Sequence, residues 1–324
     1  MRKKKSFIYI VSSIVLMLML VGCGTNNDDQ ASQDGEEVTN STEDPIILGS
    51  FVDTEGGILG NMLLLALEEE GYTITDKVQF GTPDVHRKAL LEEELHIGID
   101  YTGNGQFYSE GIDEEVWEDR EEGYKAIKEY DKEENGLDWL TPAEANNTEM
   151  LAVKEEFADE NNLETLEDFA RYVNDGGEVK FITSQLFAEK EIGLLGMEEG
   201  YGFELDSDQL IMLPHGNTAE TISALENGTD GVNVALVYGT DGSLPDLNLK
   251  VLEDPLSIPP VFEPAAVVQE EILEEYPEIE YITDQVFSTL DLETLQVMNK
   301  KVIVDGLSAK DVAQEHLEEV GILD

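Results

Sequence analysis

The chain has 324 residues, of which 72 are acidic and 19 are basic, so its formal net charge at pH 7 is −53. A balance this negative repels nucleic acid and anionic lipid, so neither is expected as a partner. Hydrophobic residues make up 41% of the chain, which is enough for packed cores and indicates a globular protein with an acidic surface rather than a disordered acidic chain.

The N-terminal segment carries the pattern of a secretory signal. Residues 2–5 are basic, residues 7–21 form a short apolar run, and the sequence LVGC at 20–23 ends in Cys23, the only cysteine of the chain. The small residues before Cys23 resemble the lipobox of bacterial lipoproteins. We therefore expect residues 1–22 to be a lipoprotein signal peptide that is cleaved before Cys23, whose sulfur is then lipidated. An ordinary signal peptide with an incidental cysteine is the alternative.

Residues 23–44 contain few apolar side chains and are expected to form a flexible acidic tether between the lipid and the folded part. With a single cysteine, the exported part can form neither an internal disulfide nor a thiolate metal site. Without residues 1–22 the chain has 15 basic and 72 acidic residues, a net charge of −57. Salt screens such self-repulsion, with a Debye length of about 3 Å at 1 M, so we infer a saline habitat.

The folded part is expected to begin near residue 45 with alternating strands and helices. Residues 46–48 predict a buried strand, 57–70 a helix, 73–80 a strand, 85–93 a helix and 96–101 a third strand. This alternation is typical of an α/β fold with a largely parallel sheet. Since ligands of such sheets bind at the carboxyl ends of strands, Ser50, Phe51, Tyr101 and Thr102 are expected to lie near one another.

A second α/β series follows from about residue 146. Strands are predicted at 150–153, 178–183, 209–213 and 232–237, with helices at 165–174, capped by Thr165 and Asp168, and at 218–226. After Pro259 and Pro260 the C-terminal third is predicted to be mostly helical. This order predicts two lobes, one formed by residues 45–145 and 261–324 and the other by residues 146–260, with the functional cleft between them.

The sequence offers little support for an enzyme. It contains neither a phosphate-binding glycine loop with its lysine nor a GxSxG nucleophile motif. The four histidines, His86, His96, His215 and His316, lack the spacing of metal ligands and are expected to be structural or exposed residues. The carboxylates are too numerous for any pair of them to indicate acid–base catalysis. No cofactor or metal is predicted.

Aromatic residues follow two predicted strands and a proline pair. Tyr101 precedes TGNG at 102–105, Tyr238 precedes GTDG at 239–242, and Phe262 follows PPV at 259–261. A single such residue is more often a packing residue, but three in matching positions favour a binding site. Converging aromatic faces attract cations by about 0.5–2 kcal/mol each and suit quaternary ammonium groups.

Six motifs in order resemble the substrate-binding proteins of osmoprotectant ABC transporters, which bind glycine betaine, choline or carnitine. They are GSFVDTEG at 49–56, LGNM at 59–62, DYTGNG at 100–105, WLTP at 139–142, NNT at 146–148 and YGTDG at 238–242. The resemblance implies a two-lobed periplasmic-binding-protein fold of type II. It also implies delivery of the ligand to a membrane permease with a separate ATPase subunit, and no enzymatic activity.

The resemblance also assigns the site. The aromatic box of the family maps onto Tyr101, Tyr238 and Phe262, and the polar residues Thr102 and Asn104 follow the first of these. Three positions depart from the family pattern. Phe51 stands where relatives commonly have a lysine that meets the ligand carboxylate, Glu149 stands where they have an aromatic residue, and Lys190 is the loose match of an arginine in the second lobe.

We therefore predict a lipid-anchored, extracytoplasmic binding protein that captures a quaternary amine, choline or glycine betaine, for an ABC importer. If Glu149 lines the cleft, a cation without a carboxylate, such as choline, should be favoured unless Lys190 replaces the missing lysine. The alternatives are a binding protein of the same fold for another cation, such as a polyamine or a basic amino acid, a hydrolase on a similar scaffold, and a ligand-sensing ectodomain.

Overall fold

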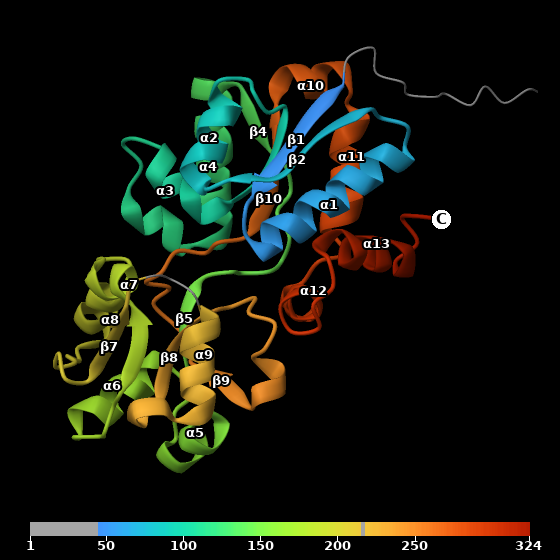
Figure 1. Cartoon of the computed structure of the whole chain (residues 1–324). Coiled ribbons are helices and arrows are strands. Elements are labelled where there is room, and N and C mark those ends of the chain that lie inside the picture. Colours follow the sequence, from blue (N-terminus) through green and yellow to red (C-terminus); the bar gives the residue numbers. More distant parts are fainter. Residues whose placement is uncertain (1–44, 215–217) are drawn as a thin grey trace, which may run out of the picture. The chain divides into compact units, whose positions relative to one another are not determined.

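The computed structural model describes residues 45–214 and 218–324. The predicted signal peptide, the lipidation site at Cys23, the tether and His215 lie outside the described residues. The described chain forms two five-stranded sheets, each covered by helices on both faces (Figure 1). No helix in these residues is long and apolar enough to cross a membrane.

The first sheet has the strand order β2-β1-β3-β10-β4. Its strands are β1 (Ile46–Phe51), β2 (Ile74–Gly81), β3 (Ile97–Tyr101), β4 (Leu137–Trp139) and β10 (Pro264–Gln269). Its helices are α1 (Thr54–Glu69), α2 (Pro83–Leu91), α3 (Gly105–Tyr108), α4 (Arg120–Asn135), α10 (Glu270–Glu275), α11 (Glu278–Phe287), α12 (Leu292–Ile303) and α13 (Ala309–Glu319). Buried residues of α1, α11, α12 and α13 form the core on one face of this sheet, and those of α2 and α4 form the core on the other.

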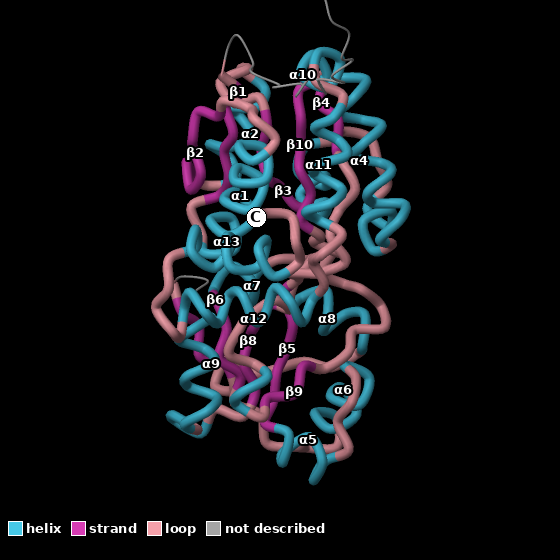
Figure 2. Tube along the Cα trace, turned by 90° about the vertical axis from the view of Figure 1, so that its right-hand side faces the viewer, coloured by secondary structure: helices cyan, strands magenta, loops and turns pink. Residues whose placement is uncertain are grey.

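The second sheet has the order β7-β6-β8-β5-β9. Its strands are β5 (Glu149–Lys154), β6 (Phe181–Ser184), β7 (Leu210–Leu213), β8 (Val234–Tyr238) and β9 (Leu249–Val251). Its helices are α5 (Glu155–Asn161), α6 (Leu166–Asn174), α7 (Gln185–Glu189), α8 (Leu194–Tyr201) and α9 (Thr218–Asn227). Helix α9 packs on one face and α6 and α8 on the other, as Figure 2 shows.

The predicted α/β fold with mostly parallel sheets is confirmed, and each sheet contains one strand that runs against the rest. In the first sheet β10 is antiparallel to β3 and β4, and in the second β5 is antiparallel to β8 and β9. These two strands follow the two places where the chain passes from one sheet to the other. Each therefore begins at the edge where its neighbour ends, so Glu149 pairs with Tyr238 and Pro264 with Tyr101.

Capping residues explain where several helices begin. Asp53 accepts a hydrogen bond from the Gly56 backbone N–H at 2.7 Å, so α1 starts at Thr54, three residues before the predicted start. The predicted capping box of Thr165 and Asp168 is present at the start of α6. At the start of α13, the Ser308 hydroxyl accepts a hydrogen bond from the Asp311 backbone N–H at 3.1 Å.

Strands β4, β9 and β10 are not among the predicted elements. The C-terminal third is mostly helical, as predicted, but β10 precedes its helices. A short apolar run such as that of β10 does not reveal by its pattern whether it is a strand or a helical segment. Strand β10 lies between β3 and β4 because the chain, after forming β9 of the second sheet, crosses back to the first sheet. The two lobe boundaries themselves stay a prediction.

Candidate functional site

A cleft of about 660 Å³ lies between the carboxyl ends of strands from both sheets. This volume is typical of small-molecule sites, which span about 300–1,000 Å³. Seven of the eight ligand-binding residues predicted from sequence line it: Phe51, Tyr101, Asn104, Glu149, Lys190, Tyr238 and Phe262. The cleft thus brings together residues that lie far apart in the chain, such as Phe51 and Phe262.

Thr102 is the predicted site residue that the cleft does not include. Its side chain is buried, and its hydroxyl donates to the Val261 carbonyl and accepts from the Glu263 backbone N–H, both at 3.1 Å. These bonds join the end of β3 to the segment that leads into β10. Thr102 therefore holds two parts of the cleft wall together from behind. Asn104 does line the cleft, but its amide donates to Asp100 at 2.7 Å.

Five aromatic rings line the cleft, and one of them, Phe107, is 65% exposed. Phe51 and Tyr101 lie side by side with their ring centroids 5.8 Å apart, at the ends of the paired strands β1 and β3. Tyr238 ends β8, and Phe262 lies on the return segment. Gly103 allows Phe262 to approach the end of β3, because a Cβ atom at this glycine would lie 2.8 Å from the Phe262 ring.

A buried histidine supports Phe51 from behind. The His86 ring meets the Phe51 ring edge to face, with centroids 5.0 Å apart. Burial lowers the pKa of His86 to about 4, so the ring is neutral at pH 7 and acts as a packing residue. In the described part of the chain, no cluster of histidines and carboxylates is arranged to hold a metal ion.

Glu55 connects three parts of the cleft. The Tyr101 hydroxyl donates to one of its oxygens at 2.8 Å, and the amide of Asn147 donates to the same oxygen at 3.1 Å. The amide of Asn299 in α12 donates to the other oxygen at 2.7 Å and to the Thr240 carbonyl at 3.0 Å. Burial raises the pKa of Glu55, while the hydrogen bonds that it accepts oppose this rise.

The loop after β8 is held by its own carboxylate. Asp241 accepts a hydrogen bond from the Tyr238 backbone N–H at 2.7 Å and another from the Thr218 hydroxyl at 3.0 Å. From the other side, the amide of Gln296 in α12 donates to the Gly239 carbonyl at 2.8 Å. The position of Tyr238 therefore depends on both α9 and α12.

Glu149 and Lys190 form an ion pair inside the cleft. The two side chains are 14% and 25% exposed, so water screens the pair only in part. The Lys190 ammonium also lies 5.7 Å from the centre of the Phe187 ring. A free Glu149 that repels a ligand carboxylate, as considered from the sequence, is therefore not what the structure contains, because Lys190 already neutralises it.

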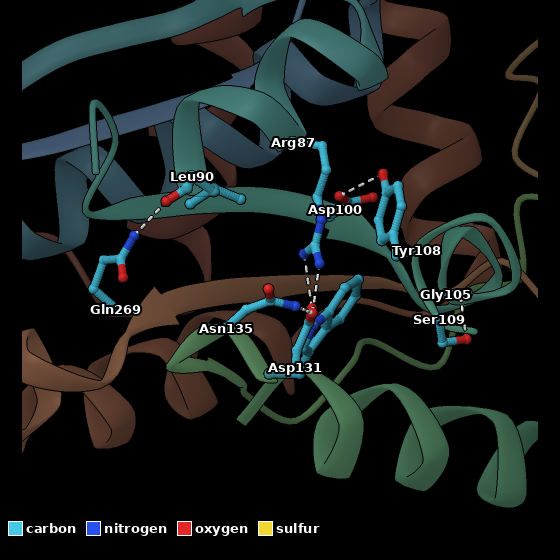
Figure 3. A network of polar contacts seen from close by, with 10 residues as sticks. Arg87, Leu90, Asp100, Gly105, Tyr108, Ser109, Asp131, Asn135 and Gln269 are labelled. Atoms are coloured by element: carbon cyan, nitrogen blue, oxygen red, sulfur yellow. Dashed lines mark hydrogen bonds and ion pairs between the residues drawn. The ribbon is translucent and has the colours of Figure 1, made fainter. Parts of the chain in front are cut away.

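A buried polar network holds the end of β3 in place (Figure 3). Asp100 accepts a hydrogen bond from the Tyr108 hydroxyl at 3.0 Å, and the Arg87 guanidinium lies 4.2 Å from the centre of the Tyr108 ring. Arg87 in turn donates to Asp131 at 2.7 Å, and Trp139 donates to the same carboxylate at 2.6 Å. Burial raises the pKa of Asp100 to about 6. The network joins β3 to α2, α4 and β4 and so limits movement of the cleft wall.

Among the polar cleft residues that sequence reasoning misses are Asp53, Glu55, Asn147, Thr240, Asp241 and Asn299. The first five lie within the motifs on which the family resemblance rests, so their place in those motifs was the available signal. Asn299 lies in a helix without any such motif. Only the packing of α12 against the loop after β8 brings it to the cleft.

The fold and the cleft define a class: a two-lobed solute-binding protein of the type II periplasmic-binding-protein fold. The family described as the substrate binding domain of ABC-type glycine betaine transport systems matches residues 44–319, and the chain belongs to this family. Proteins of this class are extracytoplasmic binding components of transporters and not enzymes. The family resemblance of the sequence is thereby confirmed.

Two curated relatives cover nearly the whole folded part. The chain is 44% identical over 277 residues to the glycine betaine-binding protein YehZ of Escherichia coli strain K12, covering 86% of this chain and 91% of that protein. It is 31% identical over 283 residues to a glycine-betaine-binding protein of Pseudomonas aeruginosa, covering 86% of this chain and 88% of that protein.

Solved structures show the same fold. The structure of apo YehZ from Escherichia coli matches with a TM-score of 0.76 at 44% identity, over 86% of this chain and 99% of that one. Lactococcal OpuAC in complex with glycine betaine matches with a TM-score of 0.55 at 13% identity, over 85% of this chain and 95% of that one. At this low identity the second likeness concerns the fold alone.

Proposed function

We propose that the cleft captures a quaternary amine, choline or glycine betaine, and that the protein delivers it to an ABC permease with a separate ATPase subunit. The observation that carries this proposal is the combination of aromatic side chains with four carboxylates, Asp53, Glu55, Glu149 and Asp241, in one cleft. Aromatic faces and carboxylates both attract a cation that cannot donate hydrogen bonds. The aromatic members of the proposed site are Phe51, Tyr101, Tyr238 and Phe262.

Of the two ligands, we propose that choline is preferred. Lys190 is the one cationic residue among those that line the cleft in the described structure, and it already forms an ion pair with Glu149. The carboxylate of glycine betaine would have to share Lys190 with Glu149 and would meet the field of the other acidic residues. The names of the two relatives favour glycine betaine instead. Lys190 is the residue through which that second ligand would bind.

Isothermal titration calorimetry tests this proposal. The protein is titrated with choline, glycine betaine, carnitine and spermidine in the same buffer at fixed ionic strength. We expect saturable binding of choline, weaker binding of glycine betaine and no binding of the polyamine. Binding of spermidine without binding of any quaternary amine would contradict the proposed ligand class, and tighter binding of glycine betaine than of choline would contradict the proposed preference.

We further propose that Cys23 carries the lipid that anchors the protein at the cell membrane, as the sequence at 20–23 predicts.

A sensing role is a second candidate function. The chain is 24% identical, over 262 residues, to a chemotactic signal transduction system substrate-binding protein of Halobacterium salinarum. Uptake of labelled choline by cells that lack this protein separates the roles, because loss of uptake supports transport and unchanged uptake supports sensing.

A further inference from the structure

Glu55 is the most deeply buried of the four carboxylates that line the cleft. It lies in the first turn of α1, where the helix dipole favours a negative charge, and its side chain is 5% exposed. The donors that reach its oxygens, namely the Tyr101 hydroxyl, the amides of Asn147 and Asn299 and the Thr240 side chain, are all neutral. These hydrogen bonds hold the carboxylate in place but do not cancel its charge.

The remaining acidic residues of the cleft have partners that account for them. Asp53 caps α1 through the Gly56 backbone N–H, Glu149 forms an ion pair with Lys190, and Asp241 caps the loop after β8. Within residues 45–214 and 218–324, Glu55 forms no ion pair with a lysine, arginine or histidine. The carbonyl oxygens of its two amide donors, Asn147 and Asn299, are also buried, and neither has a hydrogen-bond partner in the described structure. The surroundings of Glu55 therefore contain excess negative charge and unused acceptors.

We propose that Glu55 supplies the counter-charge for the cationic group of the ligand and is the residue that makes the cleft select a cation over a neutral molecule of the same shape. This inference rests on the proposed quaternary amine function. Tyr101 links the two parts of the site, since its ring lines the cleft and its hydroxyl donates to Glu55. A cation against this ring lies within the range of the Glu55 charge, which the buried setting screens little.

The test compares each ligand with its carbon isostere, in which a tert-butyl group replaces the trimethylammonium group. The isosteres of choline and glycine betaine keep the shape of the ligand and remove one positive charge. Dissociation constants are measured for the wild-type protein and for Glu55→Gln, which keeps the size of the side chain. We expect Glu55→Gln to weaken binding of the charged ligands about 10- to 100-fold and to leave binding of the isosteres within about threefold.

Two further variants serve as controls. Glu293→Gln removes an exposed glutamate from the first turn of α12 and should change neither affinity. Tyr101→Phe removes the hydroxyl that donates to Glu55 but keeps the ring and the carboxylate, and it should weaken binding of the charged ligands less than Glu55→Gln does. Thermal midpoints of all variants report on folding.

Each outcome has a distinct meaning. If Glu55→Gln weakens binding of the charged ligands and of the isosteres equally, Glu55 only positions Tyr101 and the inference is wrong. If it changes neither affinity, Glu55 is dispensable for binding and the inference is also wrong. A wild-type protein that binds the isosteres as tightly as the charged ligands also contradicts it. If the wild-type protein binds no quaternary amine at all, the proposed function itself fails.

Discussion

The ion pair of Glu149 and Lys190 should control which quaternary amine the protein prefers. Glu149→Gln frees Lys190 to meet a ligand carboxylate and removes one negative charge from the cleft. We expect this variant to bind glycine betaine more tightly and choline less tightly than the wild-type protein does. Lys190→Gln leaves Glu149 unpaired and should have the opposite effect on both ligands.

The size of the effect follows from the geometry and exposure of the pair. Two unit charges about 4 Å apart interact by about 4 kcal/mol at an effective dielectric constant of 20, before desolvation is subtracted. The side chains of Glu149 and Lys190 are 14% and 25% exposed, so water reduces this value. We expect about 1–2 kcal/mol to remain, which corresponds to a change of about 5- to 30-fold in each dissociation constant.

Calorimetric titration with both ligands gives the ratio of the two dissociation constants for each variant. Glu149→Gln and Lys190→Gln should shift this ratio in opposite directions, and the double variant should return it toward the wild-type value. Glu164→Gln breaks the ion pair with Lys250, neither residue of which lines the cleft, and should leave the ratio unchanged. If both cleft variants shift the ratio in the same direction, or neither does, the pair does not set the preference.

Four further predictions concern the aromatic site, the buried acid behind it, the surface charge and the anchor. Replacing Tyr101 or Tyr238 by Ala should weaken binding of a quaternary amine by about 1–3 kcal/mol. Replacement by Phe should weaken binding less, because the ring face is kept. Unchanged titration curves for both Ala variants would exclude these residues from the site. Burial raises the pKa of Asp100 to about 6 from an unfolded value of about 3.9, so ionisation destabilises the folded state as pH rises through this window. Relative to the wild type, Asp100→Asn should therefore gain about 2–3 kcal/mol in free energy of unfolding between pH 4 and pH 7. Denaturant titrations in which the difference between the two proteins stays constant with pH would contradict this. Because the chain without residues 1–22 has a net charge of −57, its thermal midpoint should rise from dilute buffer to molar NaCl, and an unchanged midpoint would contradict the inferred saline habitat. Cys23→Ala should release the protein from membranes or leave it uncleaved, whereas a membrane-bound variant of normal mature mass would contradict lipidation.

The sequence by itself determined the features that depend on neighbouring residues. The alternation of apolar runs predicts the strands and helices around which both sheets form, because side-chain periodicity is a local property. The capping box of Thr165 and Asp168 is readable for the same reason. Aromatic residues at the strand ends could also be selected, since carboxyl ends of parallel strands gather at one edge. Tyr101 and Tyr238 both line the cleft.

The tertiary structure alone decided which distant groups meet. Lys190 reaches Glu149 across 41 positions, and Asn299 reaches Glu55 across 244 positions. Whether a cleft carboxylate is neutralised by a lysine or held by neutral donors determines the charge that a ligand encounters. No local pattern encodes that choice, because it depends on how the strands and α12 pack after the chain has crossed twice between the sheets. The insertion of β10 between β3 and β4 has the same cause.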